Sequence, residues 1–223
     1  MAEQNSQVPA PLSDDDAWYV ALRWQQYDGE YRANCLRILS IGSFYLVHLL
    51  QYYQPLGFFA EAEKPSPVFH TAVTMLAAAW LFMALAVELL LRRQVFPKWI
   101  AYATTGADLL LLTCVLVLGG GQQSPLVLAY VLILIMCSLR VSLRLIRTAT
   151  LAAMFGYLYL MAIGKWPDMI GGRTIGVVPR YAQVMTLLGI GISGIMLGQL
   201  IRRFHGMARY YAGRRGVEVT TDA

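Results

Sequence analysis

Long apolar runs separated by charged residues dominate the chain. A helix that spans a bilayer needs about 20 predominantly apolar residues, with a range of about 17–25. Six runs approach or reach this length, and the first and fourth are short for a span. We therefore predict an all-α polytopic membrane protein, a bundle of six transmembrane helices over Ile38–Tyr53, Val68–Leu91, Trp99–Leu118, Pro125–Leu139, Ala149–Gly164 and Tyr181–Ile201.

The residues before the first run mix aromatic and charged side chains. Asp14 to Asp16 can cap a helix, and Trp and Tyr then interleave with Arg, Asp and Glu as far as Arg32. This mixture is typical of an amphipathic helix that lies in the headgroup region. A solvated helix docked on the bundle fits the pattern equally well. The sequence thus predicts a cytoplasmic tail with an interfacial helix over 1–37, a six-helix domain over 38–201 and a basic cytoplasmic tail over 202–223.

Composition supports a membrane protein over a soluble one. Hydrophobic residues make up 57% of the 223 residues, charged residues only 14%, and the mean hydropathy is +0.52. Soluble domains carry about 25% charged residues. Cys35, Cys114 and Cys137 lie in or beside apolar runs without C-x-x-C spacing, so neither a disulfide framework nor a zinc site is indicated.

The positions of the cations predict the orientation. Because Lys and Arg are retained in cytoplasmic loops, both termini are expected in the cytoplasm of a bacterial inner membrane. Cations at the span ends also indicate contacts with phospholipid headgroups, and no nucleic-acid binding is expected. Of the 18 Lys and Arg residues, 14 fall on the side of the termini, namely Arg23, Arg32, Arg37, Arg92, Arg93, Lys98, Arg140, Arg144, Arg147, Arg202, Arg203, Arg209, Arg214 and Arg215, and four on the other, namely Lys64, Lys165, Arg173 and Arg180.

Two carboxylates lie within the predicted spans, where a charge is a functional candidate. Glu88 is followed four residues later by Arg92, which is the spacing of an ion pair on one helix. Asp108 is deeper in its span, and Arg140 at the end of the fourth span is the expected partner. Asp108 therefore acts either as a structural clamp or in proton or ligand binding.

Two histidines and a glycine-rich turn form the candidate binding site. His48 and His70 lie at comparable depth near the outer ends of the first two spans, where they could hydrogen-bond a quinone, ligate a haem or simply line the interface. Between the third and fourth spans, glycines permit a tight reversal, and Pro125 is placed in the first turn of the next helix. The residues proposed for quinone binding are His48, His70, Gly120, Gly121, Gln122, Gln123, Ser124 and Pro125.

The region from Asp108 through Tyr159 carries the pattern Asp, apolar run, Gly-Gly-x-x-Ser-Pro-Leu, apolar run, Arg140 and Arg144. This pattern resembles the membrane-sensing half of six-helix bacterial sensor histidine kinases of the redox-responsive and pilus-regulating types. In the redox-responsive kinases the turn reads Gly-Gly-x-x-Asn-Pro-Phe and is implicated in ubiquinone binding, which the resemblance implies here. Ser124 and Leu126 replace the Asn and Phe.

The last span predicts how the chain associates and ends. Gly194 and Gly198 form a small-residue face that permits close approach of a helix, either inside the bundle or from another subunit. Gly206, Gly213 and Gly216 are expected to interrupt any longer helix. The sequence shows no kinase motif, so autophosphorylation is not expected.

Three functions remain open from the sequence. The first is a non-enzymatic module that acts as a sensor-like or accessory subunit of a larger membrane protein complex. The second is a redox component that binds quinone, and the third is a small transporter that uses Asp108.

Overall fold

The computed structural model of the chain describes residues 14–54, 65–93, 97, 99–165 and 178–218. These residues form helices and no strand, as expected for an all-α protein. The elements, in chain order, are α1 (Asp14–Tyr53), α2 (Pro67–Arg92), α3 (Ile100–Leu118), the 3-10 turns η1 (Gly121–Gln123) and η2 (Pro125–Leu128), α4 (Ala129–Ser138), α5 (Leu143–Lys165) and α6 (Arg180–Glu218).

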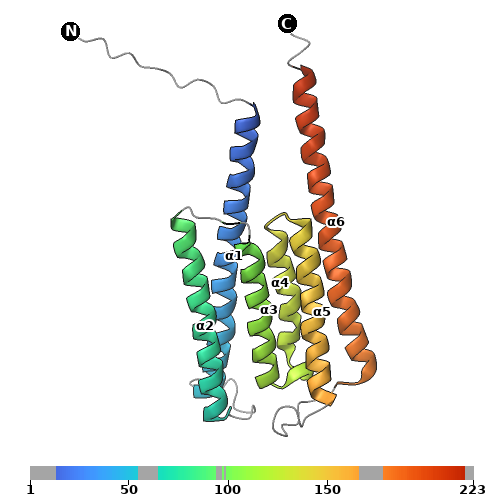
Figure 1. The fold of residues 1–223 in the computed structure, drawn as a ribbon. Helices are drawn as coiled ribbons and strands as arrows, with labels where there is room; N and C mark the ends of the chain where they lie inside the picture. The colour runs from blue at the N-terminus through green and yellow to red at the C-terminus, as the bar shows by residue number, and fades with distance from the viewer. Residues whose placement is uncertain (1–13, 55–64, 94–96, 98, 166–177, 219–223) are drawn as a thin grey trace, which may run out of the picture.

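The chain runs up and down a bundle, and the first residues of α1 and the last residues of α6 lie at the same end (Figure 1). We call this the stalk end, because α1 begins and α6 ends beyond the other helices there. We call the opposite end, which holds η1 and η2, the turn end.

Five of the described helices are long and apolar enough to cross a membrane, which indicates a multi-pass membrane protein. The apolar stretches cover Tyr27–Tyr53, Pro67–Arg92, Ile100–Leu118, Leu143–Lys165 and Arg180–Met207. The fourth predicted span is shorter, since η2 and α4 together cover only Pro125–Ser138. Five of the six predicted spans therefore correspond to helices of membrane-spanning length, and the fourth corresponds to a shorter apolar segment.

The expected break between an interfacial helix and the first span is absent from the described part of α1. A single helix of 40 residues joins both segments, so the predicted boundary at residue 37 falls in its interior. Figure 1 shows α1 continuing along the bundle instead of turning across it. The reason lies in Glu30, Asn34 and Arg37, which are buried against other helices and hold this part of α1 in the bundle.

The expectation that glycines end the last helix early is also wrong. The helix α6 runs for 39 residues through Gly206, Gly213 and Gly216 to Glu218. Each helical glycine costs about 1 kcal/mol relative to Ala, which weakens a helix but does not break it. The apolar stretch of α6 ends at Met207, so α6 projects beyond it at the stalk end.

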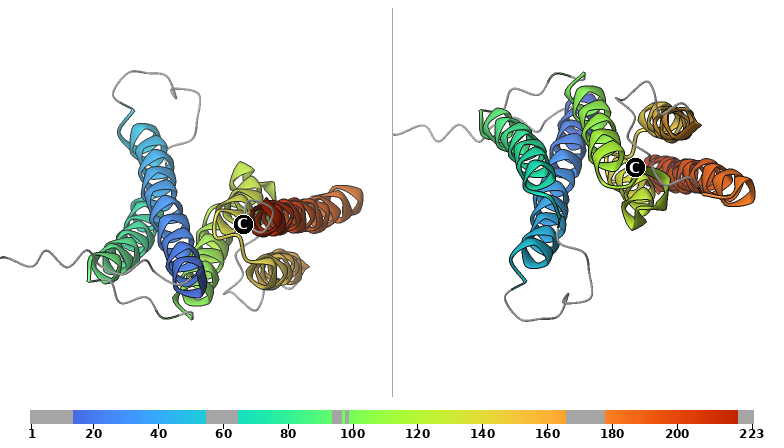
Figure 2. Two further views of the ribbon diagram at one scale, coloured as in Figure 1. Left: turned by 90° about the horizontal axis from the view of Figure 1, so that it is seen from above. Right: turned by 90° about the horizontal axis from the view of Figure 1, so that it is seen from below.

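The bundle has two unequal parts. Its main cluster of buried apolar side chains comes entirely from α3 to α6 and includes Leu116, Tyr130, Leu134 and Leu160. Seen along its axis, α1 and α2 cross as a pair beside α3 (Figure 2). The pair is joined by side chains, including Tyr45, whose hydroxyl lies 3.1 Å from Oγ1 of Thr74. Because the main apolar core lies within α3 to α6, the α1–α2 pair attaches to these helices through other contacts.

Inside the larger part, α6 lies closely against α5. A Cβ added at Gly194 would overlap the side chain of Thr150, and one added at Gly198 would lie 3.4 Å from Cδ1 of Leu143. The small-residue face therefore meets α5 of the same chain, which is one of the two arrangements that the sequence left open. Pairing with another subunit through this face stays a prediction.

Candidate functional site

A cavity of about 790 Å³ lies between the α1–α2 pair and the helices α3 and α4. Its walls are mainly apolar and include Phe44, Val73, Leu112 and Ile133. Polar side chains line it in two groups. Those contributed at the turn end are His48, Gln51, Gln123 and Ser124, and those contributed nearer the stalk end are Arg37, Ser40, Trp80 and Asp108.

The turn at one end of the cavity has the backbone that its glycines predict. Gly120 and Gly121 have φ of 95° and 64°, which L side chains rarely adopt. Ser124 then caps η2, since its Oγ accepts a hydrogen bond of 3.3 Å from the backbone N–H of Leu126, and Pro125 takes the first position. The predicted tight reversal is confirmed.

Five of the eight predicted site residues line the cavity: His48, Gly120, Gln123, Ser124 and Pro125. Gln122 points elsewhere, because its Nε2 donates to the carbonyl of Leu160 at 3.2 Å and its Oε1 accepts from Gln183 at 2.8 Å. Gln122 thus ties the turn to α5 and α6.

The remaining two predicted residues, His70 and Gly121, also lie outside the cavity lining. His70 is bound to the site through His48, with 3.1 Å between its Nδ1 and Nε2 of His48. The ring of Tyr52 stacks on His70 with a centroid distance of 3.9 Å. Two nitrogens on opposite sides of a metal ion would lie about 4 Å apart. The geometry therefore favours a hydrogen-bonded pair over axial ligation of a haem.

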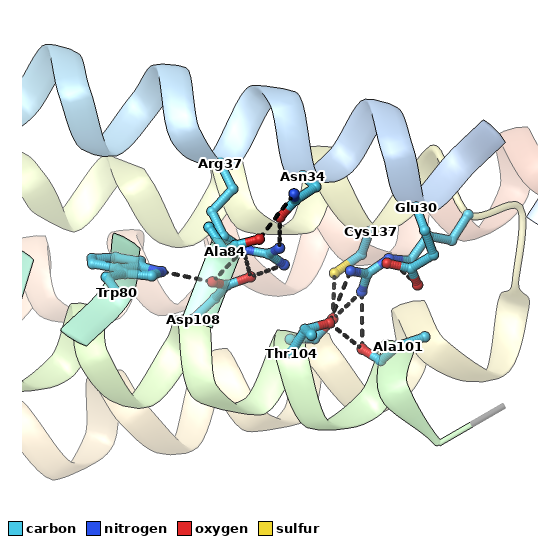
Figure 3. Close-up of polar contacts among 11 residues, drawn as sticks. Glu30, Asn34, Arg37, Trp80, Ala84, Ala101, Thr104, Asp108 and Cys137 are labelled. Atoms are coloured by element: carbon cyan, nitrogen blue, oxygen red, sulfur yellow. Dashed lines mark hydrogen bonds and ion pairs between the residues drawn. The ribbon is translucent and has the colours of Figure 1, made fainter. Parts of the chain in front are cut away.

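At the end of the cavity nearer the stalk end, Arg37 and Asp108 form a buried ion pair (Figure 3). Their side chains are only 1% and 4% exposed. The Nε and Nη2 of Arg37 each donate to the carboxylate at 2.8 Å. Nε1 of Trp80 donates to the same carboxylate at 2.7 Å, and Nη1 of Arg37 donates to Oδ1 of Asn34 at 2.8 Å. Both charges are therefore compensated without a ligand.

The predicted pairing of Asp108 with Arg140 is wrong. Arg140 instead reaches Glu30, with 2.8 Å between its Nε and Oε1 of Glu30, and its guanidinium also donates to the carbonyl of Ala101 at 2.9 Å and to Thr104 at 3.0 Å. Arg37 was expected as a cation at the membrane surface. Because α1 continues unbroken, Arg37 reaches the depth of Asp108 and takes the place expected for Arg140.

The contact between Glu30 and Arg140 is an ion pair and not an aligned hydrogen bond. Among the described residues, neither carboxylate oxygen of Glu30 has a hydrogen-bond donor in good geometry, although the charges lie 2.8 Å apart. The attraction persists at this short distance, because Coulomb attraction depends little on angle. By contrast, the predicted pair of Glu88 and Arg92 is confirmed at 3.2 Å, and Arg92 is largely exposed.

The sequence analysis missed Glu30, Asn34 and Trp80 as parts of the site. The first two stand with Arg37 at spacings of four and three residues, which places all three on one helical face. This spacing was visible in the sequence. Trp80 carried no such signal, since a Trp in an apolar run is ordinary.

Comparisons with known proteins add no relative: no family model matches the chain, and neither the curated proteins nor the solved structures include a significant match.

Proposed function

We propose that this chain is a sensor-like or accessory module of a larger bacterial membrane protein complex, and that it binds a neutral lipophilic ligand of the quinone class in the cavity. The observation that carries the proposal is the cavity itself. It brings five of the predicted site residues together with apolar walls of four helical passes. Ligand pockets commonly have this combination of apolar walls and a few polar groups.

The charges and donors around the cavity favour a neutral ligand. Arg37 and Asp108 neutralise each other, so this end of the cavity, nearer the stalk end, offers no net charge to an ion. At the turn end, the His48 imidazole and the Ser124 hydroxyl are of the type that donates to a carbonyl oxygen. A quinone presents carbonyl acceptors on an apolar ring, which matches both features.

A sensor-like role is supported by the resemblance of Asp108 through Tyr159 to the membrane-sensing half of redox-responsive kinases. It is also supported by the two long helices α1 and α6, which extend from the bundle at one end (Figure 1). A change in the cavity has a direct route to that end through α1, which lines it. Partner subunits at the stalk end would then receive the signal.

The transporter hypothesis has less support. Asp108 accepts hydrogen bonds from both Arg37 and Trp80, and its side chain is 4% exposed. A carboxylate held by two donors is suited to a clamp between helices more than to repeated protonation.

The exposed arginines support the predicted orientation in the inner membrane. Arg92, Arg144, Arg147, Arg202 and Arg203 are all exposed near the stalk end, where they can contact phospholipid headgroups. We therefore place the stalk end and both termini in the cytoplasm. A cysteine introduced at Arg144 should react only with membrane-permeant maleimides, and its labelling by an impermeant reagent outside the cell would contradict this orientation.

Bound quinone in the purified protein tests the proposed function. Ala77 lines the cavity, whereas the neighbouring Ala78 is exposed and does not. We expect lipid extracts of the wild type and of Ala78→Phe to contain quinone, and Ala77→Phe to have lost most of it because the added ring projects into the cavity and obstructs the ligand. Equal quinone in both variants, or none in the wild type, would contradict the proposal.

A further inference from the structure

One face of α1 is polar, buried and turned toward α3 and α4. Glu30, Asn34 and Arg37 are each at most 2% exposed. Arg37 binds Asp108 on α3, and Glu30 faces Arg140, which follows α4 (Figure 3). Asn34 lies between them and donates to the carbonyl of Ala84 on α2 at 3.1 Å. We call Glu30, Asn34 and Arg37 with these partners the polar seam.

The seam attaches α1 to a part of the bundle with which it shares no main core cluster. The buried apolar cluster comes from α3 to α6, so polar contacts replace the apolar packing that would ordinarily hold α1 there. Breaking such a contact leaves an uncompensated charge. The attachment is therefore specific and sensitive to single changes.

A close backbone approach accompanies the seam. A Cβ added at Gly29 would lie 2.7 Å from the carbonyl oxygen of Leu139 and 3.3 Å from Cα of Arg140. The same turn contains Val141 with φ of 48°, a left-handed conformation that β-branched residues avoid. A strained turn persists only where surrounding contacts hold it. Here those contacts include the bonds of Arg140 to α3 and its ion pair with Glu30.

The polar seam and the cavity share a pair of residues. Arg37 and Asp108 join α1 to α3, and both also line the cavity. Farther along α1, Phe44, His48 and Gln51 line the cavity too. A ligand there would contact α1 on one side and α3 with α4 on the other, so its binding requires these helices to be in place.

We propose that the polar seam couples ligand occupancy to the docking of α1. This inference rests on the proposed function, and it specifies how the same site is regulated. An occupied cavity favours the docked position of α1, and an empty one allows α1 to loosen from α3 and α4. Because coupling between two equilibria is reciprocal, a change that shifts α1 toward the loosened position must also lower the apparent affinity for the ligand.

Two glycines of α1 provide a matched pair of variants. Gly29→Ala introduces the overlap with Leu139, whereas a Cβ at Gly42 meets nothing within 4 Å. Both changes raise helix propensity equally. Decylubiquinone is titrated into each full-length protein in phosphatidylcholine nanodiscs, and its binding is followed by quenching of Trp fluorescence, since Trp80 lines the cavity.

We expect Gly29→Ala to bind decylubiquinone about tenfold more weakly than the wild type, and Gly42→Ala to bind it like the wild type. Equal dissociation constants for all three would overturn the coupling while leaving the proposed function intact. No quenching in the wild type would overturn the proposed function and the coupling with it.

Glu30→Gln provides the same test if Gly29→Ala does not fold. It keeps the shape of the side chain and removes the attraction to Arg140. Hydrogen exchange supplies the reverse measurement, because decylubiquinone should slow exchange of the amides of residues 27–37 in the wild type and slow it less in Glu30→Gln. Unchanged exchange in the wild type at saturating decylubiquinone would overturn the coupling.

Discussion

Arg37 on α1 and Asp108 on α3 form a bidentate ion pair, with Nε and Nη2 of Arg37 each 2.8 Å from a carboxylate oxygen. The pair joins the two unequal parts of the bundle at the end of the cavity nearer the stalk end. Loss of this contact should therefore affect both the stability of the bundle and ligand binding.

Asp108→Asn should strongly destabilise the protein. The change leaves Arg37 buried without its counter-charge, and breaking a buried pair in this way costs about 3–5 kcal/mol. The free energy of unfolding, measured by SDS titration in mixed micelles, provides the test. Asp28→Asn is the control, because Asp28 pairs with the exposed Arg32 one turn along the same helix and the loss should be below about 1 kcal/mol. Equal losses in the two variants would contradict the assignment of the buried pair.

Gly120→Ala should destabilise the turn, because Ala would have to adopt φ of 95°. We expect a loss of about 1 kcal/mol or more in the same unfolding assay, since left-handed backbone costs a non-glycine residue about 1–2 kcal/mol. Gly106→Ala is the matched control. Gly106 lies inside α3 with open space around its Cβ position, so Ala there should be neutral or stabilising. A stable Gly120→Ala would show that the turn has another backbone.

Gly194→Ala should loosen α6 from α5 by overlap with Thr150, whereas Gly189→Ala meets nothing within 4 Å. We expect a lower melting temperature for Gly194→Ala alone. The second change Thr150→Ala should restore much of the loss, because it removes the overlapping atoms. Failure of this rescue, together with a shift from an oligomer to a monomer on gel filtration, would indicate that Gly194 faces another subunit.

His48→Ala should reduce bound quinone, because His48 lines the cavity and offers a ring nitrogen to a carbonyl oxygen. His70→Ala should have a smaller effect, since His70 acts on the site through its 3.1 Å contact with His48. Leu46→Ala is the control on the same helix, where Leu46 is exposed. Quinone content per protein in lipid extracts measures all three. A lower quinone content in Leu46→Ala than in His48→Ala would contradict this site.

The five long apolar helices and the glycine turn could be predicted from the sequence, because both depend on local properties. Apolar length alone located the five long helices, and the spacing of Gly120 to Pro125 gave the reversal. The shortness of the fourth pass was also visible in its sequence. Glu88 and Arg92 could be paired because they lie on one helix.

Partners on different helices could not be predicted in the same way. Arg37 was interpreted only as a surface cation, so Arg140 remained as the expected partner of Asp108, whereas it pairs with Glu30. The pairing of Asp108 with Arg37, and of Arg140 with Glu30, depends on how far α1 continues and how it lies against α3. The predicted interruption at Gly206 was wrong because a single glycine is tolerated inside a long helix.

Labelling with a photoreactive short-chain quinone tests the central claim of an intramembrane ligand cavity most directly. After illumination of the wild-type protein, mass spectrometry identifies the modified residues. The account predicts labels on cavity residues of α1 and α3, such as Phe44, His48, Leu112 and Val115, that are removed by excess decylubiquinone and by Ala77→Phe. Labels confined to the exposed faces, such as Leu46 and Leu110, and insensitive to competition would contradict it.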